Sequence, residues 1–243
     1  MSQRHWPRPA LATTALALLG ATVVAGCGGS SSSTSHASAT ETAGVAATTG
    51  HKVITAGRLK GALLTKVGGS SPATPAESGD YGVLPDVHTS KQVVHGVKVK
   101  PAKCAAATDT GFGSAAFAHA PASVVTFRDG HDGVSEVLVS ATPQMASTAL
   151  AKRLPAGCGH YTATAAGKTF HYSVRAVPVP GLASQARALN VRAAGHAEAD
   201  VWSVVYRADG FVGEVTIVGP DATEASAKKL ASQAYAFAAR SLS

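Results

Sequence analysis

The sequence predicts an α+β domain: an antiparallel β-sheet meander packed with helices as a two-layer sandwich, preceded by a disordered stalk. Three observations carry this prediction. The C-terminal third holds four strand-like segments joined by short connections, the last segment is an amphipathic helix, and a stretch rich in Gly, Ser, Thr and Ala separates these elements from the N-terminus. A sheet and a helix each have an apolar face, and the two faces bury each other.

The N-terminus has the organisation of a secretory leader. Two arginines precede an apolar run over residues 10–24, which is shorter than the about 20 residues that a membrane-spanning helix needs. We therefore predict that residues 1–26 are a cleaved signal peptide. The run ends in Val24-Ala25-Gly26-Cys27, which resembles the bacterial lipobox, whose cysteine is acylated and becomes the new N-terminus. The alternative for Cys27 is a buried or disulfide-bonded cysteine.

The lipobox resemblance implies a lipoprotein held by its lipid on the outer face of the cytoplasmic membrane, in the extracytoplasmic space. Residues 27–52 then form the lipid anchor and a flexible Ser/Thr/Gly/Ala-rich linker, because such a composition cannot bury a core. Residues 53–243 form the folded domain. The Ser/Thr content of the linker leaves glycosylation open.

Charge and cysteine content narrow the function class. The chain carries a formal charge of +7 at pH 7, but its basic residues form no dense block interleaved with aromatics, so we predict no nucleic-acid partner. Besides Cys27 there are two cysteines, Cys104 and Cys158, and in an oxidising compartment they are expected to pair. A redox thiol or a metal ligand is the alternative, but no Cys-x-x-Cys motif supports it.

The first half of the domain contains a mixture of elements. Residues 55–67 have apolar positions at helical spacing, residues 68–87 are loop-like, and residues 91–100 are a possible short strand. A helical turn is expected over residues 101–107, which include Cys104.

Next comes a predicted β-hairpin, with strands at 123–127 and 134–140 around an Asp/Gly turn. Thr142 then caps a helix whose first residue is Pro143, and this helix stops near Pro155. Cys158 follows directly, so a bridge to Cys104 would hold the end of this helix against the earlier helical turn.

The C-terminal third gives the sheet its meander. Strands are predicted over residues 169–177, 188–193, 201–207 and 211–218, with a tight turn at 208–210. An Asp-x-x-Glu pattern at Asp221 and Glu224 resembles a capping box for the final helix. One face of that helix is apolar and includes Leu230 and Phe237.

The sequence predicts no enzyme, no metal site and no cofactor. It contains no nucleophile elbow, Ser-x-x-Lys, His-Glu-x-x-His or phosphate-binding loop. The histidines of the domain are scattered without the spacing of a metal site. A turn with Asp129, His131 and Asp132 could bind a hard cation weakly, although turns favour these residues anyway.

Two aromatic residues are candidates for ligand binding. Trp202 and Tyr206 lie on one side of their predicted strand, with Val204 between them. The alternative is that this side of the strand is core, buried by the final helix.

The order of features resembles a known family. The features follow one another in this order: a lipobox, a Ser/Thr stalk, a short helix with Leu63-Leu64, a Pro-x-x-Cys at Pro101–Cys104, a cysteine at a helix end, the segment 180–189, a hydrophobic hairpin and a C-terminal helix. This order is similar to that of actinobacterial lipoproteins related to the extracellular sensor domain of the PknH-type Ser/Thr kinases.

The resemblance implies an antiparallel sheet with helices around a cleft, a bound ligand of unknown identity and no catalytic residues. We therefore expect a non-enzymatic ligand-binding or sensor module whose partners are the membrane and a small-molecule, wall or lipid ligand. No kinase segment follows in this chain, so signalling would require an envelope protein partner. The alternative function is an envelope lipid carrier or assembly factor with a Mog1/PsbP-like sandwich.

Overall fold

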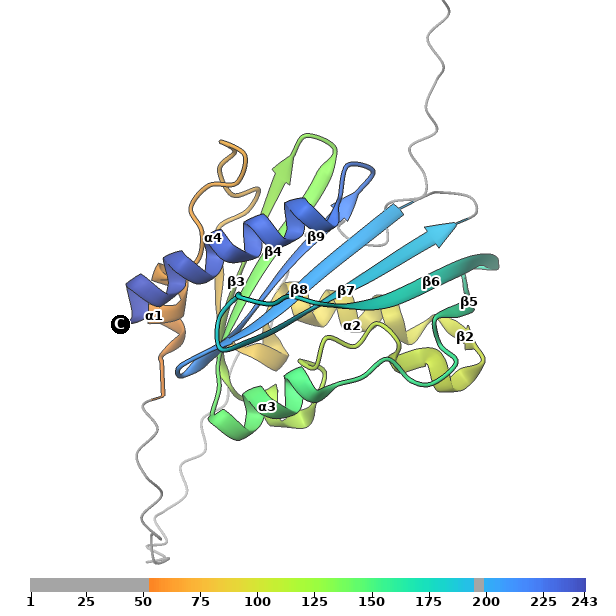
Figure 1. Cartoon of the computed structure of the whole chain (residues 1–243), viewed down its shortest axis with the longest axis horizontal. Helices are drawn as coiled ribbons and strands as arrows, with labels where there is room; N and C mark the ends of the chain where they lie inside the picture. The colour runs from red at the N-terminus through yellow and green to blue at the C-terminus, as the bar shows by residue number, and fades with distance from the viewer. Residues whose placement is uncertain (1–52, 195–198) are drawn as a thin grey trace, which may run out of the picture. The chain divides into compact units, whose positions relative to one another are not determined.

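The computed structural model describes residues 53–194 and 199–243 (Figure 1). The predicted signal peptide, the lipidation site at Cys27 and the linker therefore lie outside the described residues. Among the described helices, none combines the length and the hydropathy needed to cross a bilayer.

The sheet is a single antiparallel array of nine strands in the order β1-β3-β4-β9-β8-β7-β6-β5-β2. The strands are β1 Glu77–Asp80, β2 Lys98–Lys100, β3 Pro121–Asp129, β4 Asp132–Ser140, β5 His160–Ala165, β6 Lys168–Pro178, β7 Gln185–Ala194, β8 Ala199–Ala208 and β9 Phe211–Gly219. The predicted fold class, the β3–β4 hairpin and the β6–β9 meander are confirmed. Pairing of β4 with β9, with Leu138 opposite Gly213, joins the two parts into one sheet.

The helices are α1 Ala56–Gly61, α2 Pro85–His95, α3 Pro143–Ala151 and α4 Glu224–Leu242, with short 3₁₀ turns η1 Tyr81–Val83, η2 Ala102–Ala106 and η3 Ala115–Phe117. Helix α2 corrects the prediction of a loop and a strand in this region. Pro85 fits the first turn of a helix, where its missing N–H has no intrahelical acceptor. Strand β2 is confined to the end of the predicted segment, and α1 ends at Gly61 instead of at residue 67.

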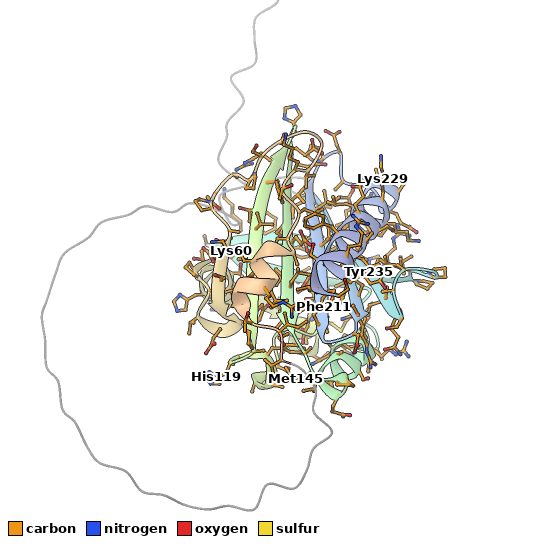
Figure 2. The ribbon with its side chains drawn as sticks, turned by 90° about the vertical axis from the view of Figure 1, so that its left-hand side faces the viewer. Lys60, His119, Met145, Phe211, Lys229 and Tyr235 are labelled. Atoms are coloured by element: carbon orange, nitrogen blue, oxygen red, sulfur yellow. A yellow bond between two sulfur atoms is a disulfide. The ribbon has the colours of Figure 1, made fainter. Side chains whose placement is uncertain are left out.

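Helices lie on both faces of the sheet because side chains alternate along each strand. Trp202, Val204 and Tyr206 of β8 belong to the core beneath α4 and α1. Val205 belongs to a second core, shared with Ala146 of α3. We call the α4 side the front face and the α3 side the back face. Figure 2, the side view, has Lys229 of α4 at its upper right, Tyr235 of the same helix below it near mid-height, and Met145 of α3 at its lower end.

The capping of α4 differs from the prediction. The helix begins after Thr223, whose hydroxyl accepts a hydrogen bond from the backbone N–H of Ser226, and the Ser226 hydroxyl accepts one from the N–H of Thr223. Asp221 lies too far upstream to cap, and its N–H instead donates to the Asp132 carboxylate at 3.2 Å. Phe237 is only half-buried, whereas Tyr235 packs edge-on against the Tyr206 ring.

The predicted disulfide is confirmed between Cys104 of η2 and Cys158, which follows α3. Both cysteines are buried, in a small core with Ala107. The bridge therefore ties the segment after α3 to η2, as expected from the position of the two cysteines.

The start of the domain is attached to the front face by three buried polar side chains of the sheet. The N–H of Ile54 donates to the Ser140 hydroxyl at 3.0 Å. The Ser123 hydroxyl donates to the carbonyl of Ala56 at 2.8 Å. The N–H of Leu64 donates to Oε2 of Glu136 at 2.7 Å. These bonds fix the segment around α1, where the chain enters the domain.

Candidate functional site

The front face of the sheet is covered over only part of its width. Helix α4 packs on β8 and β9, and α1 packs on β3 and β4. On the strands beyond α4, a group of front-face positions is polar, whereas Val177 of β6 and Ala188 of β7 still belong to the front core. The strand register aligns His160, Ser173 and Arg192 in one row, and Arg175 and Asn190 in the next. Figure 1 shows β6, β5 and β2 extending past α4.

This uncovered part contains a hollow of about 360 Å³, which we call the groove. Its lining residues are Gly159, His160, Ser173, Val174, Arg175, Asn190 and Arg192. The groove is therefore built on β5, β6 and β7, and most of its side chains can donate or accept hydrogen bonds.

Asn190 is the buried centre of the groove, with 6% of its surface exposed. Its Oδ1 accepts a hydrogen bond from Nε of Arg175 at 3.2 Å. Its Nδ2 donates to Oδ1 of Asp200 at 3.4 Å and to the carbonyl of Val201 at 3.2 Å. One buried amide thus holds an arginine and an acid in fixed positions.

Arg192 is oriented by Asp200 in a two-point ion pair. Its Nε lies 3.0 Å from Oδ1, and its Nη2 lies 2.9 Å from Oδ2. The hydrogen bonds from Arg192 hold the pKa of Asp200 below its ordinary value, more strongly than burial raises it. The carboxylate therefore stays ionised, and the guanidinium keeps its orientation.

Two further contacts hold the Arg175 side chain, one with the Trp202 ring and one with Glu224. Its guanidinium lies 4.9 Å from the centroid of the Trp202 ring, within cation–π range. Its Nη2 lies 3.5 Å from Oε2 of Glu224, at the start of α4. The Arg175 side chain is nevertheless 59% exposed, so it is both positioned and accessible.

The chemistry of this arrangement is suited to binding. Guanidinium groups present planar, forked N–H donors that match carboxylate and phosphate oxygens. Because Asn190 and Trp202 already hold Arg175 in place, a ligand would pay less side-chain entropy to engage it. His160 adds an exposed imidazole and Ser173 a half-buried hydroxyl at the same site.

The two aromatic candidates have different positions. Trp202 is 4% exposed and lies beneath Arg175, so it adjoins the groove through that side chain. Tyr206 is fully buried under α4, its ring so close to Gly213 that a Cβ there would overlap it. The structure thus brings Trp202 to the groove but not Tyr206, and direct ligand contact stays a prediction for both.

Sequence reasoning missed Arg175 and Asn190. The signal was present in the strand pattern, because the predicted strand 169–177 has His171, Ser173 and Arg175 at alternating positions. A strand face covered by a helix would carry apolar residues there. Polar residues on one face indicate that this face is open.

A second polar cluster lies on the back face. The Glu214 carboxylate accepts hydrogen bonds from Thr110 at 2.9 Å and from Thr216 at 3.2 Å, and the Thr216 and Ser203 hydroxyls are 2.8 Å apart. Burial raises the pKa of Glu214. Because Thr110 belongs to a loop, this network fastens that loop to β9, and we interpret the cluster as structural.

The acidic residues on the central strands do not form a catalytic pair. Glu136 and Asp200 are both on the front face, but β9 lies between their strands, and the register places Glu136 level with Val204, four residues along β8 from Asp200. Glu214 is on the back face. Within residues 53–194 and 199–243, no group of three His, Cys, Asp or Glu side chains is arranged to hold a metal.

Comparison with known proteins gives similarity in fold. No family model matches the chain, and no curated protein matches it. The extracellular domain of PknH from Mycobacterium tuberculosis is similar with a TM-score of 0.54 at 15% identity, over 79% of this chain and all of that domain. An uncharacterised Mycobacterium smegmatis protein, the Rv0999 ortholog, matches at a TM-score of 0.38 and 16% identity, over 59% of this chain and 76% of its own. The resemblance expected from the sequence is thus confirmed at the level of the fold.

Proposed function

We propose that this chain is a non-enzymatic, extracytoplasmic module, anchored to the membrane through Cys27, that binds a ligand with an anionic group in the groove. The observation that carries the proposal is the pair of accessible guanidinium groups of Arg175 and Arg192, held in place by Asn190 and Asp200 in an open hollow. Proteins position arginines in this way where planar recognition of carboxylate or phosphate is needed.

Three observations support the location. The leader and lipobox indicate export. The Cys104–Cys158 disulfide suits an oxidising compartment. The PknH domain that is similar in fold is extracellular. The polar lining of the groove favours an anionic ligand over the acyl chain of a lipid carrier, because an acyl chain is held by apolar side chains.

The test uses the soluble protein spanning residues 51–243, which contains every residue of the hydrophobic cores. Inorganic phosphate and citrate are titrated by calorimetry at low ionic strength, where exposed charges are least screened. We expect saturable binding that Arg175→Ala weakens by about tenfold or more and Arg175→Lys restores in part, because a charge-assisted hydrogen bond contributes about 1.5–3 kcal/mol.

Arg128→Ala is the matched control, since Arg128 is an exposed arginine on β3, far along the sheet from the groove. Equal weakening by Arg128→Ala and Arg175→Ala would show that the anions respond to net charge only. Absence of saturable binding to either anion would overturn the proposed site. Acyl chains found by mass spectrometry in the purified protein would support the lipid-carrier alternative instead.

A further inference from the structure

The uncovered front face continues beyond the groove to the edge of the sheet. In addition to His160, Arg175 and Arg192, it carries His171 on β6 and Lys98 and Lys100 on β2. We call these six residues the cationic strip. The strand register places Lys100 beside Thr162 and Thr162 beside His171, so the strip crosses β5 without a break.

The far end of the strip carries positive charge without a partner. Within the described parts of the chain, neither Lys98 nor Lys100 lies within ion-pair distance of a carboxylate. Arg175 and Arg192 differ, because Glu224 and Asp200 partner them. Both lysines are exposed. The strip as a whole is therefore positive, and its uncompensated charge is concentrated on β2.

The strip is too wide for a compact anion to contact both ends. Neighbouring strands are about 4.8 Å apart, so β2 lies about 10 Å from β6 and about 14 Å from β7. A single phosphate or carboxylate held by Arg175 would not touch Lys98 or Lys100. A ligand that uses the whole strip needs anionic groups at intervals along a chain.

The shape of the front face also favours a chain over a flat surface. Helix α4 stands on the same face, beside β7, and is joined to the strip by the Arg175–Glu224 pair. A helix is about 10 Å in diameter with its side chains, so it forms a step that would hold a planar membrane away from the strip. A linear polymer can lie along β5 and β6 beside that step.

We propose that the cationic strip binds a linear polyanion, with one anionic group in the groove at Arg175 and Arg192 and the next ones at Lys98 and Lys100. This inference rests on the proposed function and names its ligand class: a polymer with repeated phosphate or carboxylate groups. The Thr164 and Thr169 hydroxyls, 3.0 Å apart, lie in the same row as Lys98 and add uncharged polar groups along the same path.

The experiment compares three probes on the protein spanning residues 51–243: inorganic phosphate, linear polyphosphate, and vesicles of phosphatidylglycerol and phosphatidylcholine. The test variant is Lys98→Ala/Lys100→Ala. The control variant is Lys66→Ala/Lys168→Ala, which removes the same charge from exposed lysines outside the strip. We expect the wild type to bind polyphosphate at least tenfold more tightly than phosphate. The test variant should lose about tenfold in affinity for polyphosphate and little in affinity for phosphate. The control variant should keep its affinity for both.

The outcomes separate this inference from the proposed function. If phosphate binds through Arg175 but the test variant binds polyphosphate as the wild type does, the strip is not a polyanion site, although the groove still is. Binding of vesicles but not of soluble polyphosphate would overturn the linear ligand in favour of a membrane surface. If neither phosphate nor polyphosphate binds, the proposed function fails and this inference fails with it.

Discussion

Replacing Glu136 by Gln tests a carboxyl group that is buried on the front face of the sheet. Glu136 lies on β4 beneath the segment that follows α1 and is only 1% exposed. Its Oε2 accepts the hydrogen bond from Leu64, whereas Oε1 has no hydrogen-bond partner within the described residues. A glutamine has the same shape, and its amide oxygen can accept the same bond. The substitution therefore removes the ionisable proton. It also places the amide N–H donors at the position of Oε1, which has no partner, and that cost does not vary with pH.

The magnitude follows from the pKa. Burial raises the pKa of Glu136 from 4.5 to about 7, and the hydrogen bond from Leu64 opposes this only in part. A pKa difference of that size between the folded and unfolded states changes the free energy of unfolding by about 3 kcal/mol across the titration. Because the folded state binds the proton more tightly, this stability is fully present below pH 4.5 and is lost as the pH rises to about 7.

The assay is urea unfolding of the wild type and of Glu136→Gln, followed by circular dichroism at several pH values from 4 to 8. The quantity compared is the difference between the two free energies of unfolding, because other titrating groups then cancel. We expect Glu136→Gln to gain about 3 kcal/mol relative to the wild type between the acidic and the alkaline end of this range.

A difference that stays constant with pH would refute the argument, because it would mean that Glu136 titrates alike in both states. Glu224→Gln is the control, because its effect on stability should change with pH in the opposite direction. The hydrogen bond from Lys228 lowers the pKa of Glu224, so that carboxyl stabilises the fold when it is ionised. The Glu224→Gln variant should therefore lose stability relative to the wild type as the pH rises.

Three further changes give expected outcomes. Replacing both Cys104 and Cys158 by Ala opens a loop with a sequence separation of 54. Loop entropy predicts a loss of about 4 kcal/mol, measured by urea unfolding, and reduction of the wild type should lower its stability to the same level. Gly213→Ala places a methyl group against the buried Tyr206 ring and should cost about 2 kcal/mol in the same assay, whereas a neutral result would show that the ring can move away. Cys27→Ala should move the protein from the membrane fraction to the soluble fraction, and an unchanged distribution would contradict the lipid anchor.

The elements that the sequence predicted well are those defined by local signals. The β8–β9 hairpin turns at Gly210, which has a φ of +83°, a backbone conformation that favours glycine. Helix α3 begins with Thr142, whose hydroxyl accepts the N–H of Met145, followed by a proline at the first position. Each of these features is determined within a few residues, so no tertiary contact is needed to predict it.

The elements that sequence reasoning missed depend on contacts made elsewhere in the chain. Strand β5 is short, and although Tyr161, Ala163 and Ala165 alternate with polar residues, two of these three are alanines, so the pattern is a weak strand signal. Its clearest stabilising contact is the pairing of Tyr161 with Tyr172 on β6, whose rings stack with centroids 5.1 Å apart. Strand β1, Glu77–Asp80, is polar and forms only by pairing with β3. Such strands are specified by their neighbours.

The boundary between core and groove runs within single strands, which explains why the site was not visible in the composition. Along the front face of β8, the residues pass from Asp200 through Trp202 and Val204 to Tyr206. Asp200 orients Arg192 at the groove, and Tyr206 lies in the core under α4. Trp202 belongs to both, because its ring is buried by the core while its face supports Arg175. Since α4 packs on β8 and β9 but β5 and β6 lack such a cover, the edge of this helix determines which residues of the same strand face can meet a ligand.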